Sequence, residues 1–395
     1  MSEPELDHDY LRNTLSTLLS IPSPSGYTDT IARWCGEELE RLGVEYELTR
    51  RGAIRSRIPG KAEQPARAII SHVDTLGAQV SYIKDNGRLA IAPIGHWSSR
   101  FAEGARCTLF TEHGSYRGTI LPLKASGHVY NKEIDTQPVA WSQVELRIDA
   151  PVHKDIDAAA LGIAAVSMDS LGIAVGDFVA IDPCTEYLKN GFIVSRHLDD
   201  KGGVAAMFAT LKALRDSRAE LPVDTLFLFS ISEEVGVGAS SILTHDVASM
   251  IAVDNGAVAP GQNSKETGVT IGMADMTGPF DYHLTTKLIH LARDNHIPFQ
   301  RDVFRYYRSD AASAIEGGAD VRTALVTFGI DASHGYERVH ENALFSVARL
   351  LQAYALSPVE IKRDAEPSGG LEGFTDQPIE PADAGATEDE ALSKG

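Results

Sequence analysis

Acidic and imidazole side chains recur where apolar segments of this chain give way to loops. They occupy five short segments, namely His72-Val73-Asp74, Asp199-Asp200-Lys201-Gly202-Gly203, Ser232-Glu233-Glu234, Asp254-Asn255-Gly256 and His334-Gly335. Two imidazoles with several carboxylates are the ligands that a pair of hydrolytic divalent metal ions requires. Each segment alone has an ordinary structural explanation, but the ordered set predicts a metal-dependent hydrolase.

The adjacent pair Glu233-Glu234 is the most diagnostic segment, because it follows the apolar run at residues 226–231. Neighbouring carboxylates repel each other unless one binds a cation or holds a proton. A metal hydrolase needs one carboxylate as a ligand and another, uncoordinated, as general base for the metal-bound water. An isolated Glu-Glu pair is usually surface charge, so its position after a core strand is what argues for function.

The segments around His72 and Asp199 offer further ligands. His72 and Asp74 lie two residues apart on an expected strand and therefore point to the same face. A metal-bound imidazole usually donates its other N–H to a carboxylate, a role that fits Asp74. Of Asp199 and Asp200, one can cap the following helix, while the other can bridge two cations through its two oxygens.

Asp254 and His334 complete the candidate set. Asp254 ends an apolar run and precedes Asn255-Gly256, so its structural alternative is an ordinary turn aspartate. His334 follows another apolar run, and a single histidine there is more often structural. As the second imidazole of a set rich in carboxylates, it is predicted to be a ligand.

Patterns typical of helices alternate with patterns typical of strands on both sides of residues 77–187, a region in which long helical patterns are scarce. Helical spacing is expected at residues 10–19, 27–42, 202–214, 284–295 and 341–356, and strands at 44–48, 67–73, 224–231, 250–253 and 324–328. This alternation predicts an α/β domain whose mostly parallel sheet has helices on both faces. Sites in such sheets collect at the carboxyl ends of the strands, where several of the candidate ligands fall.

Short alternating runs separated by Gly, Pro, Asn and Asp dominate the intervening region, which predicts a small all-β barrel or sandwich. We therefore expect a catalytic domain in two parts, residues 1–76 and 188–362, interrupted by a barrel-like domain at 77–187. The insert is expected to be an assembly surface, and a lid is the alternative. Residues 363–395 are acidic, contain few large apolar side chains and are expected to form a disordered tail.

Composition narrows the class of protein. At 395 residues, the chain exceeds the size at which one hydrophobic core keeps growing. Its net charge of −19 argues against a nucleic-acid partner, and no apolar run approaches the ~20 residues that span a membrane. The N-terminus is acidic and has no signal-peptide pattern. Cys35, Cys107 and Cys184 are widely spaced, so neither a disulfide framework nor a cysteine zinc site is expected, and a cytoplasmic location is predicted.

The motifs resemble those of the tetrahedral (TET-type) aminopeptidases, metallopeptidase family 42, which includes glutamyl aminopeptidases. The similarity covers roughly residues 10–355, including turns of the inserted region such as Gly104-Ala105-Arg106. The resemblance implies a PDZ-like dimerisation insert, a cytosolic homo-oligomer of up to twelve subunits, and two zinc or cobalt ions per subunit. It also implies five metal ligands, namely His72, Asp199, Glu234, Asp254 and His334, with Asp199 bridging the two ions. Asp74 would orient the first histidine, and Asp200 would be the acid partner of the bridging carboxylate. Glu233 would be the catalytic base.

The chain also departs from the family pattern. Where many members carry Gly-Gly-Thr-Asp-Ala near the substrate pocket, this chain has Tyr307-Arg308-Ser309-Asp310-Ala311, and a Trp-Asp-Pro-like turn becomes Trp97-Ser98-Ser99. These changes bear on specificity and on assembly. Together with residues 21–26, they resemble a bacterial subgroup associated with the osmoprotectant N-acetylglutaminylglutamine amide, which implies a small blocked or amidated peptide as substrate.

We therefore predict a metallo-aminopeptidase that hydrolyses short peptides with a metal-bound hydroxide and Glu233 as general base. Zinc is the expected metal, and mixed His and carboxylate sites also accept cobalt or manganese. The alternatives are a deacylase, a carboxypeptidase using Arg100, Arg305 or Arg308, or an amidated-dipeptide hydrolase on the same metal core. A further alternative is a binding protein that keeps the fold without catalysis. A glycosidase is disfavoured, because two histidines beside the carboxylates fit metals better than an acid and nucleophile pair.

Overall fold

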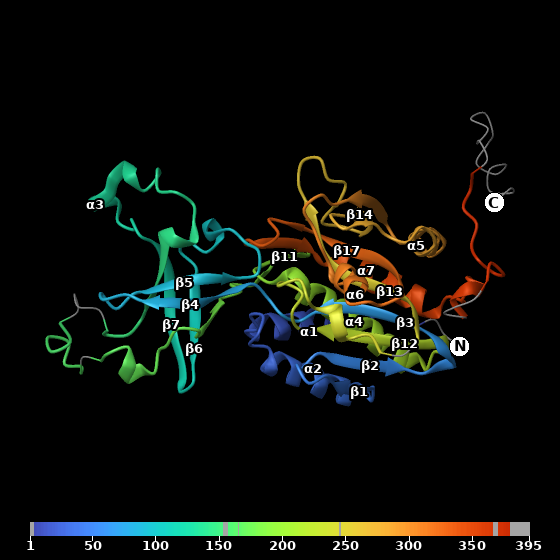
Figure 1. The fold of residues 1–395 in the computed structure, drawn as a ribbon, viewed down its shortest axis with the longest axis horizontal. Coiled ribbons are helices and arrows are strands. Elements are labelled where there is room, and N and C mark those ends of the chain that lie inside the picture. The colour runs from blue at the N-terminus through green and yellow to red at the C-terminus, as the bar shows by residue number, and fades with distance from the viewer. Residues whose placement is uncertain (1–3, 153–156, 165, 245, 366–369, 380–395) are drawn as a thin grey trace.

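The molecule, seen in a computed structural model, consists of a large α/β body and a barrel beside it (Figure 1). The structure describes residues 4–152, 157–164, 166–244, 246–365 and 370–379. Its α-helices within these residues are α1 (His8–Ser20), α2 (Asp29–Leu42), α3 (Gly127–Tyr130), α4 (Leu198–Ser217), α5 (Tyr282–Asp294), α6 (Asp310–Glu316) and α7 (Glu341–Leu356).

A mixed sheet forms the centre of the α/β body. Its strands are β1 (Glu45–Leu48), β2 (Ile54–Ile58), β3 (Gly60–His72), β10 (Glu186–Tyr187), β11 (Phe192–Ser195), β12 (Leu221–Ser230), β13 (Val247–Val258), β14 (Val269–Asp275), β15 (Gly278–Pro279), β16 (Phe299–Val303), β17 (Arg322–Asp331) and β18 (Glu337–His340). The main path runs β1-β2-β12-β3-β13-β17-β18-β11-β10, and β14 joins β15 and β16 to β17. The predicted α/β fold is confirmed.

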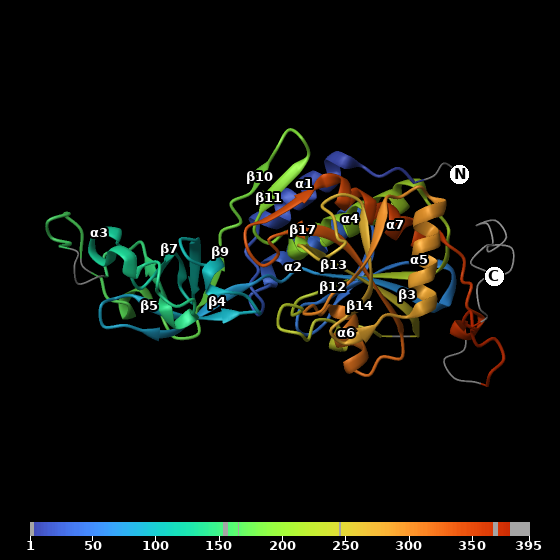
Figure 2. The same ribbon diagram turned by 90° about the horizontal axis from the view of Figure 1, so that it is seen from above.

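Parallel pairing is confined to the middle of this sheet and to its β14–β16 pair. Strands β12, β3, β13 and β17 run parallel to one another, and β14 runs parallel to β16, whereas the pairs toward both ends of the main path are antiparallel. The central strands are continuous apolar runs such as Ala68-Ile69-Ile70, all fully buried, as expected for strands covered on both faces. Figure 2 shows α4 and α7 on one side of these strands and α6 on the other.

The inserted region forms the expected closed barrel. Its strands are β4 (Gly77–Ile83), β5 (Leu89–Ile94), β6 (Arg106–Thr111), β7 (Gly114–Pro122), β8 (Val144–Ile148) and β9 (Phe178–Ile181), in the order β4-β5-β8-β7-β6-β9. Alternate side chains such as Val80, Leu109 and Leu146 point inward and form a second core, separate from that of the α/β body. The short strand β10, placed in the insert by the proposed boundary at residue 187, pairs instead with β11 of the large sheet.

The predicted turn at Asn255-Gly256 is wrong. Strand β13 continues through both residues to Val258, with Asn255 opposite Phe328 and Gly256 opposite Gly329 on β17. A Cβ atom on Gly256 would lie only 2.4 Å from Thr327 Oγ1. The glycine is therefore required for the close approach of another segment, not for a turn.

Much of the predicted acidic tail lies outside the described residues, namely 366–369 and 380–395. A 3₁₀ turn at Lys362–Ala365 begins this region, and the Asp364 carboxylate accepts a hydrogen bond from Arg322 Nε at 2.8 Å. The chain is therefore still attached to β17 at that point. No helix among the described residues is long and apolar enough to cross a membrane.

Candidate metal centre

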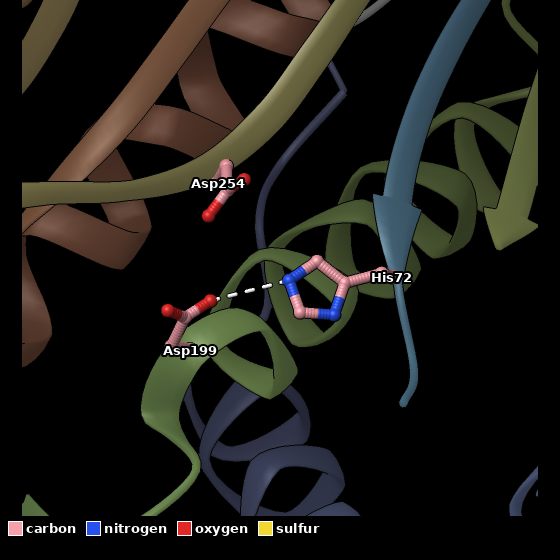
Figure 3. A group of neighbouring side chains, drawn as sticks. All are labelled: His72, Asp199 and Asp254. Carbon is pink, nitrogen blue, oxygen red and sulfur yellow. Dashed lines mark hydrogen bonds and ion pairs between the residues drawn. The ribbon is translucent and has the colours of Figure 1, made fainter. Parts of the chain in front are cut away.

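The candidate ligands converge where the central strands end. His72 is the last residue of β3, Asp254 lies in the neighbouring strand β13, and Asp199 stands at the start of α4, facing both (Figure 3). Glu234 follows β12, and His334 follows β17. Because β3, β12, β13 and β17 run in the same direction, residues up to 262 positions apart in sequence meet at one edge.

Two groups of side chains could each hold a metal ion, and both include Asp199. The first is His72, Asp199 and Asp254, and the second is Asp199, Glu234 and His334, with the potential ligand atoms in each group within 4.8 Å of one another. Asp199 Oδ1 lies 3.2 Å from His72 Nε2, while Asp199 Oδ2 lies 3.4 Å from His334 Nε2. Each oxygen of this carboxylate thus faces a different imidazole.

Main-chain carbonyl groups fix both imidazole rings. His72 Nδ1 lies 2.9 Å from the carbonyl oxygen of Asp74, and His334 Nδ1 lies 2.8 Å from that of His96. A carbonyl can only accept, so each Nδ1 donates its proton to a carbonyl, and when the ring is neutral its lone pair lies on Nε2, which faces Asp199. This is the tautomer that a metal bound at Nε2 requires.

Asp74 is positioned differently from the sequence-based expectation. Its carboxylate Oδ1 is 3.6 Å from His72 Nδ1, farther than its own carbonyl oxygen. The carboxylate instead accepts hydrogen bonds from the amides of Glu233 at 3.1 Å and Glu234 at 3.4 Å. Ser25 Oγ also donates to it at 2.5 Å. Asp74 therefore orients the Glu233-Glu234 backbone with its side chain and His72 with its main chain.

The Asp199-Asp200 peptide bond is cis, and neither residue has helical backbone angles although both lie within the bounds of α4. The Asp200 carboxylate accepts hydrogen bonds from Ser71 Oγ and from the amide of His72 on β3. Asp200 is thus tied to the strand that carries His72, while Asp199 points toward both ligand groups.

The candidate ligands shift one another's pKa values through their charges and hydrogen bonds. Burial opposes ionisation of Asp199, but hydrogen bonds from His334 and His72 hold its pKa well below its usual range. Burial and the charge of Asp199 raise the pKa of both Glu234 and Asp254 to about 8. Burial disfavours protonated His334, yet its hydrogen bond to Asp199 and the charge of Glu234 raise its pKa to about 10.

The donor set fits divalent cations. Lys201, a buried ammonium next to these acids in sequence, donates to the carbonyl oxygen of Ile21 at 2.6 Å, and burial lowers its pKa to about 7. The Oδ1 atoms of Asp200 and Asn255 are buried without a hydrogen-bond partner among the described residues. Mixed imidazole and carboxylate ligands suit zinc, cobalt or manganese, and such ions would offset the excess negative charge.

Comparison with known proteins agrees with this chemistry. The sequence matches the family described as M42 glutamyl aminopeptidase over residues 52–350. The chain belongs to this family. Membership confirms the prediction of a metallo-aminopeptidase.

Relatives of this M42 peptidase include the YhfE protein of Bacillus subtilis (strain 168), which is 39% identical over 346 residues, covering 87% of this chain and 97% of that protein. The glutamyl aminopeptidase of Lactococcus lactis is 26% identical over 236 residues, covering 59% of this chain and 62% of that protein.

Solved structures show the same fold. A TET aminopeptidase from a marine sediment Thaumarchaeota archaeon has a TM-score of 0.78 at 20% identity, covering 93% of this chain and 99% of that chain. The TET1 peptidase of Pyrococcus horikoshii has a TM-score of 0.75 at 23% identity, covering 88% and 99%.

Asn255 and Glu337 contact the candidate ligands of this M42 peptidase, although the sequence did not indicate them. Asn255 Nδ2 donates to Asp199 Oδ2 at 2.6 Å. The Glu337 carboxylate accepts hydrogen bonds from the amides of Asp199 at 3.2 Å and His334 at 3.0 Å. Asn255 was interpreted as a turn residue; the apolar residues Ala257-Val258 after it were the signal that the strand continues. No comparable signal marks Glu337, which lies on a separate short strand.

The barrel also reaches the metal centre of the M42 peptidase. A small cavity is lined by residues from the α/β body, including Asp199, Glu234 and His334, and by residues that lead into or out of the barrel, including Leu76 and Trp97. The carbonyl oxygen of His96 that fixes His334 comes from the same segment after β5. The inserted region therefore completes the edge of the sheet at which the candidate ligands lie.

Proposed function

We propose that this M42 peptidase hydrolyses the N-terminal peptide bond of short peptides with two divalent metal ions, zinc in the first instance. The observation that carries the proposal is the pair of ligand groups that share Asp199. His72 and Asp254 would complete one group, and Glu234 and His334 the other. When bound, such ions lower the pKa of a coordinated water and polarise the scissile carbonyl.

Glu233 is proposed as the general base. It belongs to neither ligand group, and its Oε2 atom lies 3.9 Å from His72 Nε2, beside both groups. Asp74 Oδ1 accepts from the Glu233 amide, which holds the residue in place. Burial raises the pKa of Glu233 well above its usual range. A carboxylate in that environment holds the proton it takes from the attacking water until the departing amine accepts it.

The positions of Arg308 and Arg305 give little support to the carboxypeptidase alternative, which needs an arginine to bind the carboxylate of the substrate. Arg308 is already paired through both terminal nitrogens with Glu316, at 2.8 Å for Nη1. Arg305 lines a surface hollow with Arg301 and Asn263, and no metal ligand lines that hollow. These arginines therefore offer little to a substrate carboxylate beside the metals, which favours recognition of a free amino terminus.

Removing the shared carboxylate tests the metal assignment. We expect Asp199→Ala to lose bound metal and activity together, because both ligand groups lose a member. Asp216→Ala, which changes an exposed aspartate paired with Lys212, should retain both. Elemental analysis of the purified variants gives the metal content. Full occupancy in Asp199→Ala would exclude the bridging role.

A panel of short peptides with free, acetylated or amidated termini tests the reaction. We expect cleavage of peptides with a free amino terminus, including amidated ones, and resistance of the acetylated set. Preferential cleavage of acetylated peptides would instead identify a deacylase. Hydrolysis only of amidated dipeptides would favour the subgroup linked to N-acetylglutaminylglutamine amide. No turnover by the metal-loaded protein on any peptide would favour a binding protein.

Assembly and location are further proposals. One solved structure with this fold, of PhTET1-12s, is described as a dodecamer, and the Pyrococcus horikoshii TET1 peptidase as assembling into a tetrahedron or a large octahedral shell. We propose that this chain is also a homo-oligomer and that its barrel, at residues 77–187, contributes a subunit contact. A cytoplasmic location remains a prediction from the cysteine usage.

A further inference from the structure

A hydroxyl from the N-terminal part of the chain reaches the acid that supports the proposed base. Ser25, in the loop between α1 and α2, donates through Oγ to Asp74 Oδ2 at 2.5 Å. Asp74 Oδ1 accepts a hydrogen bond from the amide of Glu233 at 3.1 Å, and Oδ2 also accepts from that of Glu234 at 3.4 Å. The Asp74 carboxylate therefore links the Ser25 hydroxyl to the backbone of both glutamates.

The Asp74 carboxylate is buried, so its orientation depends on the groups that donate to it. The exposed fraction of Asp74 is 0%, and that of Ser25 is 7%. A buried carboxylate needs hydrogen bonds in place of water, because an unpaired buried charge is costly. Without the Ser25 hydroxyl, Asp74 loses one donor, and its carboxylate would turn toward another donor or take up a water. Either change moves the acceptor that holds the Glu233 amide.

The loop that carries Ser25 is itself held against the end of β3. The Ser25 amide donates to the carbonyl oxygen of Thr75 at 3.1 Å, and the Thr75 amide donates to that of Ser23 at 2.9 Å. Ser23 Oγ donates to the carbonyl oxygen of Val73 at 2.8 Å. These hydrogen bonds fix the backbone on both sides of Ser25, so its hydroxyl is held beside Asp74.

Contacts with α4 and with the barrel hold the two ends of the same loop. Lys201 Nζ, from α4, donates to the carbonyl oxygen of Ile21 at 2.6 Å. At the other end, the Tyr27 ring is stacked on Phe110 of β6, with centroids 4.8 Å apart. The loop therefore joins α4, the end of β3 and the barrel, and it is ordered before any metal or peptide binds.

We propose that Ser25 is a positioning residue that fixes the Asp74 carboxylate and, through it, the proposed base Glu233 and the candidate ligand Glu234. The inference rests on the proposed function and adds a residue to it. Ser25 precedes residues 52–350, which match the family, so the match does not assign it this role. Ser25 takes no part in proton transfer; its contribution is the placement of groups that do.

The first test is Ser25→Ala in the metal-loaded full chain. Loss of a residue that supports the ligands from outside typically costs about 10–100-fold in metal affinity or activity. We expect kcat to fall by about this factor with little change in KM, because the base is displaced while the groups that bind the peptide remain.

Ser56→Ala is the matched control. The Ser56 side chain is also buried, on β2, and its Oγ donates to the carbonyl oxygen of Phe227 at 2.8 Å. Both variants lose one buried hydrogen bond and should be destabilised to a similar extent in chemical denaturation. Ser56→Ala should nevertheless keep the kcat of the wild type, which separates positioning of the base from a general loss of stability.

Two further measurements do not depend on turnover. Calorimetric titration with zinc should show about 10-fold weaker binding of one ion to Ser25→Ala, because Glu234 belongs to one of the two ligand groups. Hydrogen exchange followed by mass spectrometry should show faster exchange in the peptides that contain the Glu233 and Glu234 amides. Ser56→Ala should match the wild type in both measurements.

The Asp74→Ala background shows whether Ser25 acts through Asp74. Once the carboxylate is absent, removal of the Ser25 hydroxyl has nothing further to release. We therefore expect the double variant to bind zinc as Asp74→Ala does, within about twofold. Independent, additive losses would show that Ser25 acts by another route, and the proposal would be wrong.

The outcomes for Ser25 are distinct from those for the peptidase. Wild-type kcat, or unchanged exchange of the two glutamate amides, in Ser25→Ala would overturn the positioning role, as would an equal loss of kcat in Ser56→Ala. An inactive wild-type protein would count against the proposed function, while zinc affinity and exchange would still test Ser25. If Ser25→Ala does not fold, Ser25→Cys keeps the shape with a weak donor; full kcat and zinc affinity in that variant would contradict the proposal.

Discussion

Asp199 shows how much a single carboxylate is constrained at this site. Its two oxygens face His72 and His334, its Oδ2 also accepts from Asn255 Nδ2 at 2.6 Å, and its amide donates to Glu337 at 3.2 Å. A side chain held from its backbone to its tip cannot turn away when a cation binds. The ligands are therefore already ordered when the chain has folded, so metal binding loses little free energy in placing them. This favours tight metal binding.

Glu233→Gln separates the general base from the ligands. The amide is close in size to the carboxylate but cannot take a proton, so we expect at least ~100-fold lower kcat. Metal content should remain that of the wild type, because Glu233 belongs to neither ligand group. Steady-state kinetics and elemental analysis check the two expectations. Glu220→Gln, at an exposed position paired with Lys61, is the matched control; a fully active Glu233→Gln would remove the residue from the mechanism.

Metal binding is expected to strengthen as pH rises toward about 8. In the metal-free protein, burial and Asp199 raise the pKa of Glu234 and Asp254 to about 8, so both hold protons that a cation must displace. Because these folded-state values lie above the usual values of 4.5 for Glu and 3.8 for Asp, the metal-free protein loses stability as pH rises from about 4 to about 8.

Thermal unfolding with and without chelator measures this effect. The stabilisation by metal should grow from about pH 4 to about pH 8 and continue to grow less steeply above pH 8, because the metal must also displace the proton of His334, whose pKa is about 10. Calorimetric titration below pH 8 should also show protons released as the ion binds. A stabilisation that is independent of pH would contradict the protonated state of the two carboxyl groups.

At the scale of elements, the continuation of β13 through Asn255 and Gly256 decides the geometry of the site. A turn after Asp254 would have carried Asn255 away from the sheet. The strand instead keeps both residues beside β17, which places the Asn255 amide against Asp199. The hydrogen bond that holds the Asp199 carboxylate thus depends on a regular strand pairing.

Gly256→Ala tests this pairing. The new Cβ would lie 2.4 Å from Thr327 Oγ1 and 3.2 Å from Ser264 Oγ, so the strands must shift. We expect a loss of about 1–3 kcal/mol in the free energy of unfolding, the usual cost of overpacking. Chemical denaturation measures it. Thr327→Ala should restore part of the loss by making room, whereas Gly370→Ala, with no atom within 4 Å of its Cβ, should have no effect. An unaffected Gly256→Ala protein would show that the strands separate easily.

At the scale of the whole molecule, the barrel and the α/β body both contribute to the edge where the candidate ligands lie. The barrel has its own core, yet its connections supply the His96 carbonyl and Trp97 to the metal centre.

Native mass spectrometry tests the assembly. We expect a particle whose mass is a whole multiple of the single chain, because the fold is shared with TET peptidases described as multi-subunit assemblies. Deleting residues 363–395 should leave that mass unchanged apart from the shortened chains, since the proposed contact lies on the barrel. A monomer at micromolar concentration would contradict the proposal.

Much of the α/β body and of the barrel could be predicted from periodicity alone. Helix α7 has the predicted bounds, and the inserted region forms the expected barrel. Antiparallel pairing at the ends of the large sheet was not predictable, because a short half-exposed strand such as β1 has no pattern that specifies its partner's direction. Glu337 was also missed, because it lies on a separate short strand and contacts Asp199, which is distant in sequence.

The sequence by itself determined which residue types were available, because two histidines and several acids after apolar runs have few uses other than binding cations. Only the tertiary structure decided their grouping. Whether Asp199 would stand between His72 and His334, and whether Asp74 would orient a ring or a backbone, depends on how strands from three parts of the chain align. That alignment follows from packing over the whole sheet, which no local pattern contains.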